Sequence, residues 1–261
     1  MTCRHTQRST EMRTALAVAA VFTSLAACSG ADKRSDSADQ QQLTVFAASS
    51  LTSTFGVLEQ AFEKERLNVD VVVSFDSSTT LAEQISQGAP ADVIATADQA
   101  SMQVVADADQ LAAEPVPFAS NTLVVVTPPD NPADIQDLRD LDTADFVLCD
   151  PSAPCGAASA QVLEASNITA RAKSLEPNVT AVLSKVTLGE ADAGLVYVTD
   201  ARAAGNEVAT INIPAGGNVV NPYYIAAVKN SPESELAEEW LALVTSQAGQ
   251  RVLQAAGFGR P

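Results

Sequence analysis

Hydroxyl side chains follow two neighbouring apolar segments of this chain, at points where helical patterns begin. Ser49 and Ser50 come directly after the apolar run 43–48, and Ser77 and Ser78 follow the β-branched run 68–75. Both runs predict buried strands, and the apolar spacing behind each serine pair predicts a helix. At a helix start, a hydroxyl and the first unpaired backbone N–H groups can point outward together. Such a junction can bind a small anion through neutral donors and the positive end of the helix dipole.

The repetition of this junction carries more weight than either copy. A single serine pair is explained more simply by helix capping, with Ser49 or Ser50 at the N-cap position. Two copies in consecutive strand–helix units can meet beyond the carboxyl ends of parallel strands, where open sheets bind their ligands. The loop 150–156 also leads into a predicted helix, 157–166, and brings further backbone N–H groups to a helix start. We therefore expect an anion site at this edge.

Strands alternate with helices throughout residues 43–261, which predicts an α/β fold. Other strands are expected at 93–97, 119–127, 144–149, 192–198, 207–213 and 221–228. We expect two lobes, each with a mixed, mainly parallel sheet flanked by helices. Lobe 1 comprises residues 43–121 plus 223–261, and lobe 2 comprises residues 122–222. Two strands that cross between them, near 120–124 and 220–224, form the predicted hinge.

The first 27 residues have the layout of a secretory signal, with three arginines before the apolar stretch 15–27. This stretch is too short to span a bilayer. The sequence Leu-Ala-Ala-Cys at 25–28 resembles the lipobox of bacterial lipoproteins, in which the signal is cut before the cysteine and the sulfur carries a diacylglycerol. An ordinary signal beside an unrelated cysteine is the alternative. We expect lipidated Cys28 and a flexible tether over residues 28–42.

The balance of charge excludes two classes of partner. The formal net charge is −17, and removal of residues 1–27, with three arginines and Glu11, takes away +2 and leaves −17 − 2 = −19. Nucleic-acid binding needs a basic face, so it is not expected. The protein should contact a membrane only through the lipid on Cys28. An anion site in so acidic a protein must depend on local dipoles.

The reactive side chains argue against an enzyme. The one histidine, His5, lies in the signal, so the mature chain has neither a histidine-dependent triad nor a histidine-bound metal. In an exported protein, the isolated pair Cys149 and Cys155 predicts a disulfide around a short loop. A thiol–disulfide enzyme is a weak alternative because the spacing is not Cys-x-x-Cys and no basic group lies nearby in sequence. No cofactor is expected.

Several motifs together resemble the periplasmic molybdate-binding proteins of ABC importers. They are TVFAASSL at 44–51, SFDSSTTLA at 74–82, GAPADV at 88–93, AGLVYVTDA at 193–201 and the Gly-Phe ending at 249–258. The resemblance covers nearly all of residues 43–259, in order. It implies a type II periplasmic-binding-protein fold, whose two lobes close on molybdate or tungstate. Its implied partners are an ABC permease with its ATPase, and a monomer is expected. The implied location is the outer face of the cytoplasmic membrane.

The same resemblance implies the ligand-binding residues. The family holds its oxyanion only through neutral donors, so molybdenum enters only as the oxyanion. The matching donors are the hydroxyls of Ser50, Ser78 and Tyr197 and the backbone N–H groups of Cys155 and Val179, with Ser49 and Ser77 as secondary candidates. Cysteine at position 155 departs from the small residue common in the family, but a backbone donor survives such a change. Without the resemblance, a tyrosine at the end of a strand, such as Tyr197, is interpreted as a half-buried packing residue.

A pocket made only of fixed donors favours oxyanions that carry no proton, because a protonated one needs an acceptor. This argument selects molybdate, tungstate or sulfate over phosphate. A binding protein for sulfate or another tetrahedral oxyanion therefore remains an alternative. An enzyme on the same fold is opposed by the lack of a general base next to Ser50 or Ser78 in the sequence. A purely adhesive or scaffolding lipoprotein would leave the repeated serine junctions without a use.

Overall fold

The computed structural model describes residues 40–261. The predicted signal, Cys28 and the predicted tether up to residue 39 lie outside this part of the chain. The first strand begins at Gln41, so the folded body starts two residues earlier than the predicted residue 43. Within residues 40–261, none of the helices combines the length and the apolar character needed to cross a bilayer.

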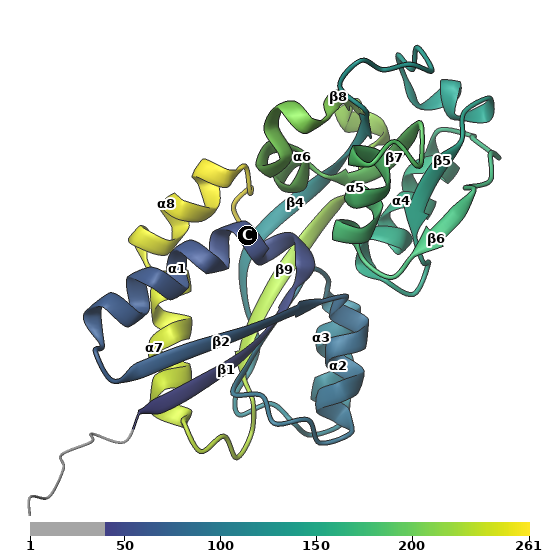
Figure 1. Cartoon of the computed structure of the whole chain (residues 1–261). Helices are drawn as coiled ribbons and strands as arrows, with labels where there is room; N and C mark the ends of the chain where they lie inside the picture. Colours follow the sequence, from purple (N-terminus) through teal and green to yellow (C-terminus); the bar gives the residue numbers. More distant parts are fainter. Residues whose placement is uncertain (1–39) are drawn as a thin grey trace, which may run out of the picture. The chain divides into compact units, whose positions relative to one another are not determined.

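Strands and helices alternate along the described residues, which confirms the predicted α/β class (Figure 1). The strands are β1 (Gln41–Ala48), β2 (Val69–Asp76), β3 (Val93–Thr96), β4 (Val116–Thr127), β5 (Phe146–Cys149), β6 (Ser174–Glu176), β7 (Ala193–Tyr197), β8 (Ala209–Asn212) and β9 (Val220–Ala227). The α-helices are α1 (Thr52–Glu65), α2 (Ser78–Ser86), α3 (Gln99–Asp107), α4 (Pro154–Ala165), α5 (Val179–Thr187), α6 (Val198–Ala204), α7 (Ser234–Thr245) and α8 (Gln247–Ala256). Short 3₁₀ helices occupy Ser49–Leu51, Leu138–Asp142, Gly205–Glu207 and Ala215–Gly217.

The strands pair in the order β2-β1-β3-β9-β4-β7-β5-β6, with β8 on β4. Pairing is parallel within β2-β1-β3 and within β7-β5-β6. It is antiparallel wherever β4 or β9 takes part. Each end of the sheet is therefore a parallel α/β unit, and the carboxyl ends of its strands can carry a site.

Strands β4 and β9 run between the two parallel units (Figure 1). The first half of β4 pairs with β9 up to Thr122, and its second half, from Leu123, pairs with β7 and β8. Strand β9 in turn pairs with β3 from Tyr224 onward. Strand β4 thus contributes to both halves of the sheet, and β9 lies beside its first half, so bending of these two strands would change the angle between the lobes.

Two apolar clusters cover opposite faces of the first sheet unit. Alternate residues of β1 point to opposite faces, so Val45 packs with α1, α7 and α8, whereas Phe46 packs with α2 and α3. Phe55, Phe62 and Trp240 form edge-on aromatic contacts in the first of these clusters, with ring centroids 5.5–5.6 Å apart. A third cluster lies around β4, β5, β7 and helices α4 and α5. Each lobe thus has its own core.

Several local predictions differ from the structure. Neither Ser49 nor Ser50 caps α1, because a 3₁₀ turn over Ser49–Leu51 precedes that helix. Ala48 is the N-cap residue of the turn and Leu51 that of α1, and neither forms a side-chain capping bond. The predicted helix 157–166 begins three residues earlier, at Pro154, because proline suits the first helical position. Strand β6 and helix α6 were not predicted. Both are short, and neither has a clear apolar period.

Candidate functional site

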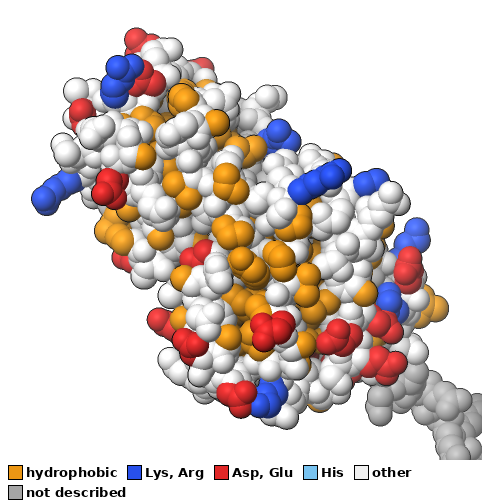
Figure 2. All heavy atoms as spheres, turned by 180° about the vertical axis from the view of Figure 1, so that it is seen from behind, with side chains coloured by type: hydrophobic (Ala, Val, Ile, Leu, Met, Phe, Trp, Pro, Cys, Tyr) orange, Lys and Arg blue, Asp and Glu red, His pale blue; other side chains and the backbone are white. Residues whose placement is uncertain are grey.

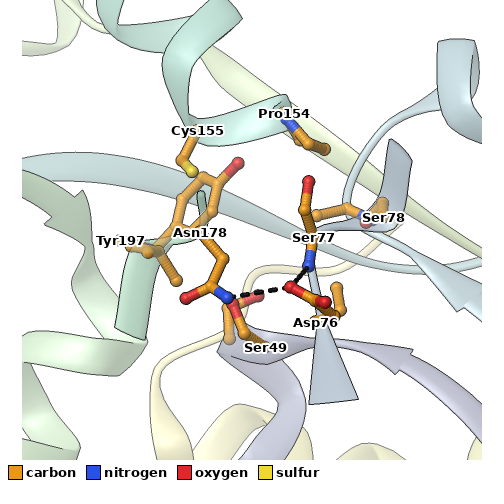
Figure 3. Close-up of a pocket in the computed structure, with 12 residues that line it drawn as sticks. Ser49, Asp76, Ser77, Ser78, Pro154, Cys155, Asn178 and Tyr197 are labelled. Carbon is orange, nitrogen blue, oxygen red and sulfur yellow. Dashed lines mark hydrogen bonds between the residues drawn. The ribbon is translucent and has the colours of Figure 1, made fainter. Parts of the chain in front are cut away.

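One small pocket between the lobes gathers all the predicted donors (Figure 3). Its lining residues come from the ends of β1, β2 and β7 and from the starts of α2, α4 and α5. They are Ala48, Ser49, Ser50, Asp76, Ser77, Ser78, Ala97, Pro154, Cys155, Asn178, Val179 and Tyr197. The structure therefore brings together the five predicted donors and both secondary candidates. That they bind an oxyanion remains a prediction.

Three helix starts point their free N–H groups at this pocket. Ser78, Pro154 and Val179 are the first residues of α2, α4 and α5, and all three line it. The first N–H groups of a helix lack intrahelical acceptors and carry the positive end of its dipole. Pro154 has no N–H, so Cys155 supplies the first one of α4. Three such helix ends favour an anion at their meeting point.

Ser77 has the clearest need for a ligand. Its side chain is 5% exposed, and its Oγ has no hydrogen-bond partner in the described structure. An unpaired buried hydroxyl costs about 1–3 kcal/mol. Figure 3 places it at the edge of the pocket beside Pro154 and Ser78. Since an oxyanion would give this hydroxyl an acceptor, Ser77 is as strong a donor candidate as Ser78.

A carboxylate lies among these donors, so the prediction of a purely neutral lining is wrong at one position. Asp76 ends β2, and its Oδ1 accepts hydrogen bonds from the N–H of Ser77 at 2.7 Å and from Nδ2 of Asn178 at 2.9 Å. The second bond joins the lobes. Asn178 also caps α5, because its Oδ1 accepts from the N–H of Ala181 at 3.0 Å. The position of Asp76 directly before Ser77 and Ser78 could have indicated its place in the site.

The disulfide predicted between Cys149 and Cys155 is present and closes the loop between β5 and α4. Gly156 follows it, and a Cβ there would overlap the carbonyl oxygen of Asp150. The N–H of Ala153 donates to that same oxygen at 2.9 Å. The bond and the glycine together press α4 closely against the loop, which holds the N–H of Cys155 at the pocket.

The pocket is narrow and partly open to solvent. Its free volume is about 10 Å³, which is room for about one water molecule. Besides Asn178 and Asp76, the hydroxyl of Thr79 donates to the carbonyl oxygen of Ser152 across the lobes at 2.7 Å. A tetrahedral oxyanion is larger than water, so a slight separation of the lobes would make room for it.

The two buried tyrosines near the pocket keep their protons. Burial is the main cause that raises the pKa of Tyr197 and of Tyr223 above its usual value. Neutral tyrosine can donate a hydrogen bond, whereas phenolate cannot. Tyr197 lines the pocket, so it can act there as a donor at neutral pH.

Titration of Asp200, a buried residue next to Tyr197, should lower the free energy of unfolding as pH rises from about 4 to about 7. Burial raises the pKa of its carboxyl to about 7, although the N–H of Tyr197 donates to it at 3.1 Å and partly lowers the pKa. The native protein thus retains a proton that the unfolded chain releases over this range, with a slope of at most about 1.4 kcal/mol per pH unit. The stabilising contribution is complete below pH ~4 and is lost as pH approaches 7.

Asp200→Asn should lack this dependence, because an amide oxygen still accepts from the N–H of Tyr197 but does not titrate. Urea unfolding of the wild type and of Asp200→Asn at pH ~5 and pH ~8 measures the difference in their free energies of unfolding. The variant should gain stability relative to the wild type at the higher pH. An equal difference at both pH values would contradict the prediction.

Charged side chains surround an apolar area on one face of the molecule. On the face shown in Figure 2, acidic and basic side chains lie toward the ends and rim, and apolar side chains occupy the middle. Within residues 40–261, no cluster of three or more histidine, cysteine or acidic side chains is placed to hold a metal ion.

Comparisons with known proteins agree with this geometry. The periplasmic molybdate-binding protein of Azotobacter vinelandii has the same fold, with a TM-score of 0.74 and 22% identity over 84% of this chain and 99% of that one. The sulfate-binding protein SubI of Mycobacterium tuberculosis gives a TM-score of 0.73 and 17% identity over 84% and 86%. The molybdate-binding protein ModA of M. tuberculosis H37Rv is 40% identical over 256 residues, which span 96% of this chain and 98% of that protein.

Two α/β lobes joined by crossing strands, with a narrow pocket between them, define a two-lobed binding protein of the type II periplasmic-binding-protein fold. Residues 43–259 match the family model described as bacterial extracellular solute-binding protein. The chain belongs to that family. Its relatives named above are binding proteins and not enzymes.

Proposed function

We propose that this protein captures molybdate outside the cytoplasm and delivers it to an ABC importer, with tungstate as a second ligand. The observation that carries the proposal is the convergence of Ser50, Ser78, Tyr197 and three helix starts on one pocket. The 40% identity to a protein named for molybdate binding supports it over the whole folded chain. Five to seven charge-assisted hydrogen bonds of about 1.5 kcal/mol each are enough for micromolar binding or better.

Capture would depend on movement of the lobes. Lobe 1, residues 43–121 plus 223–261, supplies Ser50 and Ser78, and lobe 2, residues 122–222, supplies Cys155, Val179 and Tyr197. Strands β4 and β9 are the proposed hinge, since β4 pairs with strands of both halves of the sheet and β9 pairs with β4 up to the point where β4 crosses. An anion held by donors from both lobes favours the closed form, and an ABC permease can recognise that form.

Export and anchoring complete the proposal. Members of this family act outside the cytoplasm, and residues 1–27 have the layout of a signal. We propose that a lipid on Cys28 holds the mature protein, as a monomer, at the outer face of the cytoplasmic membrane. Mass spectrometry of the membrane-extracted protein would find the diacylglycerol on Cys28, and an unmodified cysteine would contradict this part.

Sulfate is the second candidate ligand, because the solved sulfate-binding protein SubI shares the fold almost equally well. Molybdate, tungstate and sulfate all lack a proton at neutral pH, so the donors of this pocket can bind each of them. Calorimetric titration of the purified mature protein with these three oxyanions and phosphate separates the candidates. Molybdate and tungstate should bind, and sulfate and phosphate should bind far more weakly. Tight sulfate binding without molybdate binding would transfer the assignment to sulfate.

Ser50→Ala and Ser78→Ala should each weaken molybdate binding by about 1–3 kcal/mol, roughly 5- to 150-fold, because each removes one donor to a charged ligand. Thermal unfolding without ligand should show a moderate loss of stability, since Ser50→Ala leaves the buried Tyr223 hydroxyl, and Ser78→Ala the N–H of Ala97, without its partner. Calorimetry on each variant measures the loss. Unchanged affinity in both would reject these two serines as ligands.

A further inference from the structure

We propose that two side chains of the hinge strand β9, Tyr223 and Asn221, act as positioning residues that turn the hydroxyls of Ser50 and Tyr197 into donors aimed at the bound anion. Neither Tyr223 nor Asn221 lines the pocket. Each forms a hydrogen bond with a hydroxyl that does. The inference rests on the proposed function and extends it from the donors to the residues that orient them.

The bond between Tyr223 and Ser50 has one productive direction. Their hydroxyl oxygens lie 2.7 Å apart, and either could donate. Tyr223 is fully buried, with the rings of Phe118, Tyr197 and Phe258 edge-on around it. The Asn121 side chain also lies within hydrogen-bonding reach of the Tyr223 hydroxyl, as a donor to it, so the Ser50 oxygen is the acceptor left for the Tyr223 proton. The Ser50 hydroxyl can instead direct its own proton into the pocket. Tyr223 therefore donates to Ser50, and Ser50 donates to the ligand.

The side-chain amide of Asn221 fixes the direction in which the Tyr197 hydroxyl donates, as Tyr223 does for Ser50. Its Nδ2 lies 3.1 Å from the Tyr197 hydroxyl and 3.2 Å from the carbonyl oxygen of Ala97. A carbonyl oxygen accepts only, so the nitrogen and not the oxygen of the amide must face it. An amide nitrogen donates only, so the Tyr197 oxygen must accept. The proton of Tyr197 is left free for the pocket.

A backbone N–H group orients the Ser78 hydroxyl in the same way. The N–H of Ala97 donates to its Oγ at 2.9 Å. A backbone N–H cannot accept, so the Ser78 proton must also point elsewhere. The hydroxyl oxygens of Ser50, Tyr197 and Ser78 therefore each accept one hydrogen bond from a protein group outside the pocket lining or from the backbone. Each hydroxyl retains its proton to donate to the anion.

This arrangement has consequences for specificity. A hydroxyl that already accepts a hydrogen bond is a stronger donor, because chains of hydrogen bonds polarise one another. Its oxygen is also less able to accept from a protonated oxyanion. In the lining, Oδ1 of Asp76 already accepts from Ser77 and Asn178, which leaves Oδ2 as the acceptor of that carboxylate without a bond within residues 40–261. Tyr223 and Asn221 thus favour fully deprotonated oxyanions over hydrogen phosphate.

The arrangement also depends on closure. Asn221 contacts Ala97, at the end of β3 in the first lobe, and Tyr197, at the end of β7 in the second. Separation of the lobes would break one of these contacts. Alignment of the Tyr197 donor is therefore completed as the lobes close.

Double-mutant cycles test the proposal, with molybdate affinity of the mature protein as the readout. Tyr223→Phe should weaken binding about tenfold and lower the ratio of molybdate to phosphate affinity. In a Ser50→Ala background the same change should have less than about a twofold effect, since Tyr223 acts through Ser50. Tyr224→Phe is the matched control. It removes a hydroxyl from the next residue of β9, which does not line the pocket, and should leave affinity unchanged.

A second double-mutant cycle, on Asn221 and Tyr197, tests the proposal without any change at Tyr223. Asn221→Ser should weaken binding about tenfold alone and less than about twofold in a Tyr197→Phe background. Wild-type affinity in Tyr223→Phe and in Asn221→Ser would overturn the proposal. So would losses that persist in full in the Ser50→Ala and Tyr197→Phe backgrounds. Failure of the wild-type protein to bind molybdate would contradict the proposed function instead, and the cycles would then use whichever of the four oxyanions binds.

Discussion

Gly156→Ala is expected to weaken molybdate binding at least a hundredfold and to destabilise the protein by about 3 kcal/mol. The added Cβ would overlap the carbonyl oxygen of Asp150 and lie 2.7 Å from that of Cys149. The loop cannot move aside freely because Cys149 is tied to Cys155 by the disulfide. The start of α4 must therefore move, and it carries Pro154 and the N–H of Cys155 away from the pocket. Calorimetry and urea unfolding measure the two effects.

Gly56→Ala is the matched control for this experiment. Gly56 lies inside α1, and a Cβ there would meet nothing within 4 Å. Alanine has a higher helix propensity than glycine, so this variant should be more stable by about 1 kcal/mol and bind molybdate normally. If Gly156→Ala bound molybdate within about threefold of the wild type, the close packing of the loop on α4 would not position the donor.

The predicted site depended on features that repeat along the sequence. Serine pairs behind two strands indicated where two parallel strands end, and the structure brings Ser50 and Ser78 to one pocket. The local role assigned to the first pair was wrong, since neither Ser49 nor Ser50 caps α1. The site was nevertheless located, because the end of a strand fixes the position of the next residues whether or not they cap a helix.

The residues that sequence reasoning missed act through contacts between distant segments. Tyr223 and Ser50 are 173 residues apart in the chain, and Asn178 and Asp76 are 102 apart. Tyr223 lies in an apolar strand pattern that predicts packing and nothing further. Its role becomes visible only when β9 passes beneath the first strand–helix junction. Such crossings are set by the tertiary fold, and no local spacing encodes them.

Asp76→Asn is expected to tighten molybdate binding about tenfold or more at low salt. The carboxylate places a negative charge in the lining of a site for a dianion. Two unit charges at 4 Å repel by about 4 kcal/mol at an effective dielectric constant of 20, and Asp76 is only half-buried, so we expect about 1–2 kcal/mol to remain. Asparagine keeps the size and an oxygen that can accept from Ser77 and Asn178. Calorimetry at low and high salt should show the advantage shrinking as salt screens the charge.

The same carboxylate should stabilise the protein without ligand, which explains how a site for anions can hold it. Asp76 stands at the start of α2 and accepts from the N–H of Ser77, so it takes the place of an anion at that helix end. Asp76→Asn should therefore lower ligand-free stability by about 1 kcal/mol while it raises affinity. Asp70→Asn, at the other end of β2, removes the same charge far from the pocket and should change neither affinity nor its salt dependence. If Asp76→Asn bound molybdate more weakly, the bond to Asn178 would matter more for closure than the repulsion does for binding.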